Sequence, residues 1–336
     1  MTPLLDRVRT GEVLLADGAM GTLLIERGMG PGECPELFGH EHSEHLEEIS
    51  RSYLAAGADI LQTNTFGASP LKLESYGLAD RTEEINRAAV AVVRRAIGDA
   101  TVGAQTTAQS KIQNPKSKIV YLVACCGPSG RMLKPYGDTD PEVIAASFDR
   151  QVRVLKDAGV DAINFETMMD LAELVIAVRA AKAVAPELPV IGSATYEQRR
   201  PRHSSMSHPS DRSHPSDSAF VTIMGNTIPH VVRALEEAGT DVIASNCGNG
   251  IEQMIEIARE LRAATKLPIS IRPNAGLPVI VSDKTTYPET PEFMAGKLPE
   301  LLDAGVSIIG GCCGTTPEHI GAFRHVLDSR APRKAS

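Results

Sequence analysis

The 336-residue sequence lacks several features that would assign it to particular protein classes. It has no apolar run near the ~18 residues needed to cross a bilayer, and its first residues contain no apolar stretch of signal-peptide length. It also lacks a basic excess: the formal net charge of −8 argues against a nucleic-acid-binding surface. Its six cysteines include two adjacent pairs, which is not the pattern of a disulfide framework. We therefore expect a cytoplasmic protein that binds neither nucleic acid nor membrane.

The sequence does contain enough apolar residues for a full core, with 42% hydrophobic and 23% charged residues. Short runs rich in Val and Ile alternate eight times with longer amphipathic stretches. We predict strands at residues 13–17, 59–64, 120–125, 161–166, 190–195, 241–246, 268–272 and 307–311. We predict helices at residues 45–56, 81–97, 141–158, 169–184, 229–238, 251–264, 291–304 and 317–327. Eight such units predict an α/β fold, a single (β/α)₈ TIM barrel, with a doubly wound open sheet as the alternative.

Two polar segments interrupt this alternation. Residues 101–119 contain the string QNPKSK, and residues 203–218 contain the tandem hexads SHPSDR and SHPSDS. Serine, proline and charge at this density favour loop or disorder. We predict one barrel domain at residues 1–330 with these two insertions, followed by a disordered tail at 331–336. The second insertion follows a strand's carboxyl end, on the face where barrel active sites lie.

Three cysteines are the strongest candidates for a functional site. Cys312 and Cys313 follow the eighth predicted strand, and Cys247 follows the sixth. Because alternate strands of such a barrel contribute side chains to the same interior layer, the three thiols can meet at the catalytic end. A glycine beside each of them leaves backbone freedom for metal binding. The alternative is that all three are ordinary packing cysteines.

Three thiolates suit a catalytic Zn²⁺ with its fourth position open. Such a site has a net charge of about −1 and is a poor Lewis acid for a carbonyl group. It can still hold a substrate thiol as a thiolate at neutral pH, because coordination deprotonates the thiol. The pattern therefore favours a thiol-alkylating enzyme over a hydrolase.

Five strand-end strings then resemble one known family. They are DGAMGT from Asp17, QTNTFGA from Gln62, NFET from Asn164, NCG from Asn246 and GCCG from Gly311. Together they are similar to the homocysteine S-methyltransferase family, which includes the homocysteine-binding module of cobalamin-dependent methionine synthase and betaine–homocysteine methyltransferase. The similarity runs from about residue 14 to about residue 327.

This resemblance implies a zinc-dependent barrel with Cys247, Cys312 and Cys313 as the ligands and homocysteine as the acceptor. It also implies that the amino-acid end of homocysteine is held near Asp17, Gly18, Thr63 and Glu166, and the small residue Ala19 beside Gly18 is a further candidate contact. A substrate ammonium would offset the cost of burying the Glu166 and Asp17 carboxylates, and backbone N–H groups at Gly18 and Ala19 could receive the substrate carboxylate. The alternatives are an internal salt bridge for Glu166, a turn role for Asp17 and an ordinary strand role for Thr63.

Homocysteine bound through sulfur is expected to attack the methyl group of a donor and give methionine. Among the donors that the family uses, the strings GPSG from Gly127 and KPYGD from Lys134 favour the corrinoid-linked branch. Methylcobalamin would then be delivered by a separate corrinoid protein. The alternatives are a corrinoid-linked enzyme for another thiol or methylated substrate, and a non-catalytic zinc protein or corrinoid partner.

The remaining cysteines and histidines are not predicted to bind the metal. Cys125 and Cys126 also end a strand, but that strand has the opposite parity. His203, His208 and His214 lie in the second insertion and are predicted to be exposed polar residues. Surface or packing roles are predicted for Cys34, His40, His42 and His45.

Overall fold

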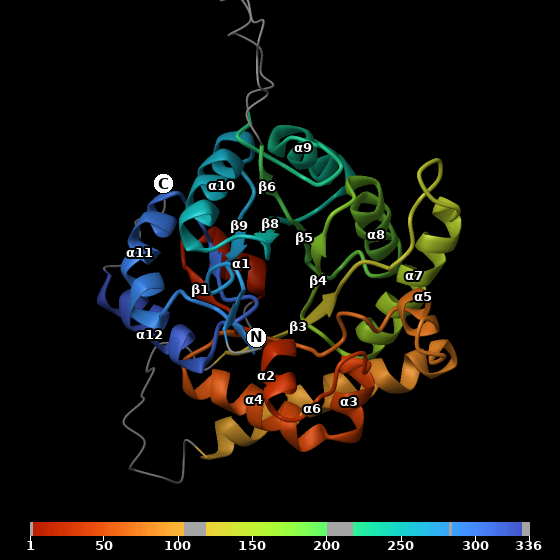
Figure 1. Cartoon of the computed structure of the whole chain (residues 1–336), viewed down its shortest axis with the longest axis horizontal. Coiled ribbons are helices and arrows are strands. Elements are labelled where there is room, and N and C mark those ends of the chain that lie inside the picture. The colour runs from red at the N-terminus through yellow and green to blue at the C-terminus, as the bar shows by residue number, and fades with distance from the viewer. Residues whose placement is uncertain (1–2, 104–118, 200–217, 282–283, 331–336) are drawn as a thin grey trace, which may run out of the picture.

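The structure is a computed structural model that describes residues 3–103, 119–199, 218–281 and 284–330 (Figure 1). Eight parallel strands form the central sheet in the order β1-β12-β9-β8-β5-β4-β3-β2. They are β1 (Leu14–Leu15), β2 (Ile60–Gln62), β3 (Tyr121–Cys126), β4 (Ala162–Met168), β5 (Val190–Ala194), β8 (Val242–Asn246), β9 (Ile269–Arg272) and β12 (Ile308–Ile309). A parallel bridge between Ala16 and Ile60 joins the two edge strands, so the sheet closes into the predicted barrel.

Helices follow the strands and surround the barrel, as Figure 1 shows. The longer helices are α4 (Ser43–Ala55), α6 (Thr82–Gly103), α7 (Pro141–Ala158), α8 (Leu171–Val184), α9 (Ile228–Ala238), α10 (Ile251–Ala264), α11 (Pro291–Asp303) and α12 (Pro317–Ser329). Each overlaps a helix predicted from the apolar periodicity. Helix α6 runs six residues beyond its predicted end, to Gly103, which is inside the first predicted insertion.

Two large apolar cores stabilise this arrangement, beside a small third cluster that contains Cys34, Ala68, Leu73 and Ile85. One lies between the strands and the outer helices and includes Phe148, Phe165 and Phe323. The other fills the barrel interior with alternate strand residues, such as Leu14 and Val242, and extends to helix α1 (Leu4–Arg9). Because successive strand residues face opposite sides, the same alternation carries polar residues into the interior at the carboxyl ends of the strands.

Several short elements lie outside the predicted repeat. Helices α2 (Gly21–Glu26), α3 (Pro35–Glu41) and α5 (Pro70–Glu74) and the 3₁₀ turn η1 (Ala79–Arg81) precede the longer helices, and β10 (Val279–Val281) pairs antiparallel with β11 (Lys284–Thr286). β6 (Glu197–Gln198) pairs antiparallel with β7 (Phe220–Val221), which brings the two ends of the second predicted insertion together. Residues 104–118, 200–217 and 331–336, which include most of both insertions and the predicted tail, lie outside the described residues.

None of the helices within the described ranges combines the length and the apolar character that crossing a membrane requires.

Candidate metal centre and substrate pocket

The three predicted ligands converge at the carboxyl end of the barrel. Sulfur atoms of Cys247, Cys312 and Cys313 all lie within 4.8 Å of one another, and the Cys247 and Cys313 sulfurs are 4.0 Å apart. Tetrahedral Zn–S bonds of ~2.3 Å would place two sulfurs about 3.8 Å apart. The three thiols are free and partly buried. Their spacing therefore fits one metal ion with little rearrangement.

The backbone around the cysteines is fixed by the loop that follows β9. The Cys312 N–H donates to the Pro273 carbonyl at 2.8 Å, and the Ala275 N–H donates to the Cys313 carbonyl at 3.0 Å. Cys247 directly follows β8 and has a left-handed φ of 62°, which non-glycine residues rarely adopt. Such a conformation persists only where the surroundings hold it, and it is a common feature of functional sites.

Asn246, at the end of β8, links the cluster to the neighbouring strands. Its side-chain oxygen accepts hydrogen bonds from the Thr167 N–H at 2.8 Å and the Ser193 hydroxyl at 2.7 Å. Its side-chain nitrogen donates to the Thr167 hydroxyl at 2.8 Å and lies 3.7 Å from the Cys312 sulfur. Asn246 therefore positions the Cys312 thiol against β4 and β5.

Because the three thiols lie close together, their pKa values differ from one another. Hydrogen bonds from Cys312 and Cys313 lower the pKa of Cys247 to about 3. The same contact with Cys247 raises the pKa of Cys312 to about 11, and Cys247 and Cys312 also raise the pKa of Cys313. One thiolate is stabilised at the expense of the other two, so three thiolates together need a cation. This donor set fits a thiophilic ion such as zinc.

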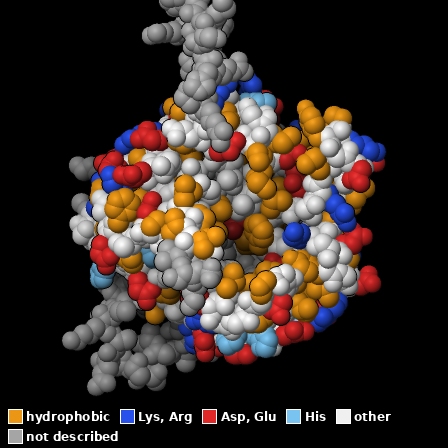
Figure 2. Space-filling model, in the orientation of Figure 1, with side chains coloured by type: hydrophobic (Ala, Val, Ile, Leu, Met, Phe, Trp, Pro, Cys, Tyr) orange, Lys and Arg blue, Asp and Glu red, His pale blue; other side chains and the backbone are white. Residues whose placement is uncertain are grey.

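A cavity of about 290 Å³ lies beside the sulfurs and opens at the carboxyl end of the barrel. Its walls include all three cysteines and the predicted substrate residues Asp17, Gly18, Ala19, Thr63 and Glu166. Hydrophobic side chains surround the hollow on this face of the molecule (Figure 2). The structure therefore brings the predicted residues together around a single pocket, with room for a small molecule next to the sulfurs.

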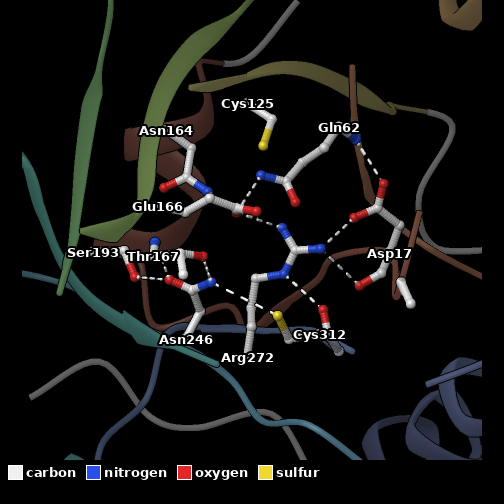
Figure 3. A network of polar contacts seen from close by, with 12 residues as sticks. Asp17, Gln62, Cys125, Asn164, Glu166, Thr167, Ser193, Asn246, Arg272 and Cys312 are labelled. Carbon is white, nitrogen blue, oxygen red and sulfur yellow. Dashed lines mark hydrogen bonds and ion pairs between the residues drawn. The ribbon is translucent and has the colours of Figure 1, made fainter. Parts of the chain in front are cut away.

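Arg272, at the end of β9, lies between the two carboxylates of the pocket (Figure 3). Its Nη2 donates to Asp17 Oδ1 at 2.7 Å, and its Nη1 lies 3.4 Å from Glu166 Oε2. Burial disfavours the charged guanidinium, but Asp17 and then Glu166 raise the pKa of Arg272 above its ordinary value. The side chain is 9% exposed and stays charged. Arg272 therefore already places a positive charge beside Asp17 and Glu166, the two carboxylates that are predicted to bind a substrate ammonium.

The two carboxylates differ in how fully the protein satisfies them. Both Asp17 oxygens have partners, since Oδ2 accepts the Gln62 N–H at 2.7 Å and Oδ1 accepts Arg272. Burial raises the pKa of Asp17 to about 6 against the opposing effect of Arg272. In Glu166, the side chains of Gln62 at 2.9 Å and Asn164 at 2.7 Å both donate to Oε2. No nitrogen donor within the described ranges reaches Glu166 Oε1, which leaves this oxygen available to a ligand.

Gly18 and Ala19 lie at the cavity wall, where the chain packs closely. A Cβ atom on Gly18 would lie 2.7 Å from both the Thr315 Oγ1 and the Tyr53 hydroxyl, so only glycine fits there. The Ala19 N–H already donates to Thr315 Oγ1 at 3.2 Å, whereas the Gly18 N–H has no partner within the described part of the chain. Of the two N–H groups predicted to receive a substrate carboxylate, one is therefore used by the protein itself.

Thr63 lines the cavity, but its hydroxyl is also part of the strand-end structure. It lies 2.6 Å from the Thr65 hydroxyl and accepts the Cys125 N–H at 3.2 Å. Thr65 in turn donates to the Cys125 carbonyl at 2.7 Å. These bonds join β2 to β3, so the position of Thr63 fits both a substrate contact and the strand role given as its alternative.

The other described cysteines and histidines are not part of the three-cysteine group, although Cys125 lines the same cavity. Cys125 and Cys126 are buried, and burial raises the pKa of both thiols, with Glu166 adding to the effect. His42 and His45 form a second group of possible ligands with Glu44, but this group is largely exposed. The histidines of the second insertion lie outside the described residues.

Sequence reasoning missed four residues of the site: Gln62 and Arg272, which line the cavity, and Asn164 and Asn246, which contact Glu166 and Cys312. All four are on barrel strands, at positions that alternation turns toward the interior. A charged or amide side chain at the inward position of a buried strand end was the signal that could have identified them. Arg272 is the most informative of the four, because an arginine is rarely buried without a partner.

Comparison with known proteins agrees with the geometry. The family model described as homocysteine S-methyltransferase matches residues 14–327. A methionine synthase from Mycobacterium tuberculosis is 32% identical over 95% of this chain, and one from Mycobacterium leprae is 31% identical over 96%. The chain spans about a quarter (25%) of the length of each of these relatives. The solved structure of the metallated homocysteine methyltransferase MmuM from Escherichia coli has the same fold, with a TM-score of 0.72, 23% identity, and 96% of this chain and 99% of that one covered.

Proposed function

This chain belongs to the homocysteine S-methyltransferase family, and on that premise we propose that it transfers a methyl group to the thiol of homocysteine, giving methionine, with zinc held by Cys247, Cys312 and Cys313. The observation that carries the proposal is the convergence of three sulfurs within 4.8 Å at the wall of a cavity. The same cavity presents a carboxylate oxygen without a nitrogen donor from the described residues. A small thiol with an ammonium group matches both features.

Zinc bound by these thiolates would supply the charge that keeps an acceptor thiol deprotonated at neutral pH. The residues of the chain would do the rest. Asn246 holds Cys312 in place, and the loop after β9 fixes the backbone of Cys312 and Cys313. Glu166 would receive the substrate ammonium at Oε1 and so orient the acceptor sulfur toward the donor methyl group.

We further propose that the methyl donor is a methylcorrinoid carried by a separate protein. The chain matches a quarter (25%) of the length of relatives named methionine synthase, and its GPSG and KPYGD strings favour the corrinoid-linked branch. The face around the cavity also suits a partner, because exposed apolar side chains occur in several connections that follow strand carboxyl ends. They are Ile25, Met132, Tyr136, Met169, Ile223, Met224, Leu277 and Ile280.

A second candidate is methyl transfer to or from a different thiol or methylated compound. Arg272 favours this candidate, because it already provides a cation for Asp17 and Glu166. Their charges therefore do not by themselves require a substrate ammonium.

A zinc-binding or corrinoid-partner protein without catalysis is the non-enzymatic alternative. We also keep as proposals the single domain at residues 1–330 with its two insertions and tail, and a cytoplasmic location suited to free thiols.

The test compares zinc content and methionine formation in the wild type and in Cys312→Ala. Methylcobalamin, betaine, S-methylmethionine and S-adenosylmethionine are each supplied as donor. We expect about one zinc per chain and activity with the corrinoid donor in the wild type, and loss of both in the variant. Cys34→Ala removes a buried thiol outside the cluster and should retain both. Full zinc content and activity in Cys312→Ala would contradict the proposal, and activity with betaine alone would contradict the corrinoid donor.

A further inference from the structure

The guanidinium of Arg272 has one nitrogen that the protein uses only weakly. Its Nε donates to the Gly311 carbonyl at 3.0 Å, and its Nη2 binds Asp17 at 2.7 Å. The Nη1 group, which has two hydrogens, makes one hydrogen bond within the described residues, the 3.4 Å contact with Glu166 Oε2. That length is at the outer limit for a hydrogen bond, and Arg272 lines the cavity. Nη1 could therefore donate to a ligand oxygen without breaking the pair between Arg272 and Asp17.

Glu166 offers the opposite charge at the same wall. Its Oε2 accepts Gln62, Asn164 and Arg272, while no nitrogen donor among the described residues reaches Oε1. The weak thiol donor Cys125 also contacts this carboxylate, and burial and Glu166 raise its pKa, so it stays neutral. The cavity wall thus has an acceptor oxygen and a donor nitrogen on two adjacent side chains.

The charges at the cavity wall are consistent with a ligand that carries both an ammonium and a carboxylate group. Asp17 and Glu166 contribute two negative charges and Arg272 contributes one positive charge. Asp17 is fully paired by Arg272 and by the Gln62 N–H, so it acts on the ligand only through Arg272. The Ala19 N–H, an expected carboxylate donor, is already bonded to Thr315. Of the two predicted N–H donors only that of Gly18 is left unpaired among the described residues, and Arg272 Nη1 offers a charged donor at the same cavity.

We propose that Arg272 is a specificity-determining residue that receives the carboxylate of the acceptor, while Glu166 Oε1 receives its ammonium. The acceptor class is then a thiol that carries a zwitterionic amino-acid group. Asp17 acts as the positioning residue that holds the guanidinium. This inference rests on the proposed function, because it assumes that the acceptor sulfur binds at the cysteine cluster.

The experiment measures thiol binding to protein loaded with Co²⁺, through the thiolate-to-metal absorption band. Homocysteine is compared with two analogues: 3-aminopropane-1-thiol, which lacks the carboxylate, and 4-mercaptobutyrate, which lacks the ammonium. In the wild type, loss of either group should weaken binding about 10–100-fold, as for other hydrogen bonds to charged groups. Arg272→Met should bind homocysteine and 3-aminopropane-1-thiol with affinities that differ by less than about threefold. It should still bind 4-mercaptobutyrate much more weakly than homocysteine.

Glu166→Gln is the matched variant. In this variant loss of the ammonium should have little effect on affinity, while loss of the carboxylate should still weaken binding. Arg272→Lys keeps the positive charge and should keep part of the preference for the carboxylate. If Arg272→Met does not fold, the wild type and Arg272→Lys still test the proposal. Wild-type binding of 3-aminopropane-1-thiol as tight as that of homocysteine would overturn it, as would an unchanged carboxylate effect in folded Arg272→Met. If no thiol changes the spectrum, the proposed function fails as well.

Discussion

The two ends of the barrel each contain a cluster of acidic and basic side chains, and of these two clusters the one at the carboxyl end lines the cavity beside the cysteines. At the amino end of the strands, Asp59 accepts the Leu15 N–H at 3.0 Å and Arg324 at 3.1 Å, with Arg7 at 3.9 Å. Arg7 also pairs with Glu12, and Arg324 with Asp328, so each charged group of this cluster has a partner of opposite charge. At the carboxyl end, two carboxylates share Arg272, and one of their oxygens faces a cavity.

This difference separates a structural ion pair from a binding site within one fold. Asp59 at the amino end and Arg272 at the carboxyl end are both buried, and both clusters contain arginine, so neither feature distinguishes them. The distinguishing features are the open cavity and the adjacent thiols, which occur together only at the carboxyl end among the described residues. Barrel enzymes generally place their sites at this end and their stabilising residues at the other.

The largest expected effect concerns stability at the amino end. Asp59→Asn should lower the free energy of unfolding by about 3 kcal/mol, because it leaves Arg324 without its buried partner. Urea titration measures the loss. Homocysteine affinity should remain within about twofold of the wild type, because Asp59 does not line the pocket. A large change in affinity without a change in stability would remove the distinction between the two clusters.

Glu166→Gln should have the opposite signature. We expect homocysteine affinity to fall about 30-fold, because a hydrogen bond to a charged group is lost, while the free energy of unfolding changes by less than about 1 kcal/mol. The amide oxygen of glutamine can still accept the donors that reach Oε2. Binding measured by titration calorimetry and urea unfolding of the same preparations give the two values. A stability loss equal to that of Asp59→Asn, with affinity intact, would make Glu166 a structural residue.

The smallest effect is the pH dependence that Asp17 introduces. Burial raises its pKa in the folded state to about 6, from an ordinary value of 3.8. The unfolded chain therefore loses this proton first as the pH rises, and the folded state loses stability between about pH 4 and 6. Asp17→Asn should remove this slope, which is on the order of 1 kcal/mol per pH unit. Unfolding curves across that range test it, and an identical slope in both proteins would contradict the assignment.

Much of the fold was readable from the sequence because parallel strands buried on both faces are continuous apolar runs. All eight predicted strands and eight predicted helices overlap elements of the structure, and the family prediction is confirmed. The hairpin pairs β6–β7 and β10–β11 were missed, because strands of two or three residues leave no periodicity to detect. The short helices α2, α3 and α5 escaped prediction for the same reason.

The site was predicted in part. Cys247, Cys312 and Cys313 could be placed together because each directly follows a strand of the same parity. Arg272 could not be paired with Asp17, since the two are 255 residues apart in the chain and meet only when the barrel closes. The prediction that Asp17 and Glu166 bind a substrate ammonium stays a prediction. Glu166 is the stronger candidate, because both oxygens of Asp17 already have partners in the protein.

The most direct test of the account is to count the sulfur atoms around the bound metal. X-ray absorption spectroscopy of the zinc-loaded protein should show three sulfurs at ~2.3 Å, and a fourth after homocysteine is added. That increase would establish that the acceptor thiol binds at Cys247, Cys312 and Cys313. A sulfur count that stays the same on addition of homocysteine, or a metal bound mainly through nitrogen and oxygen, would contradict it.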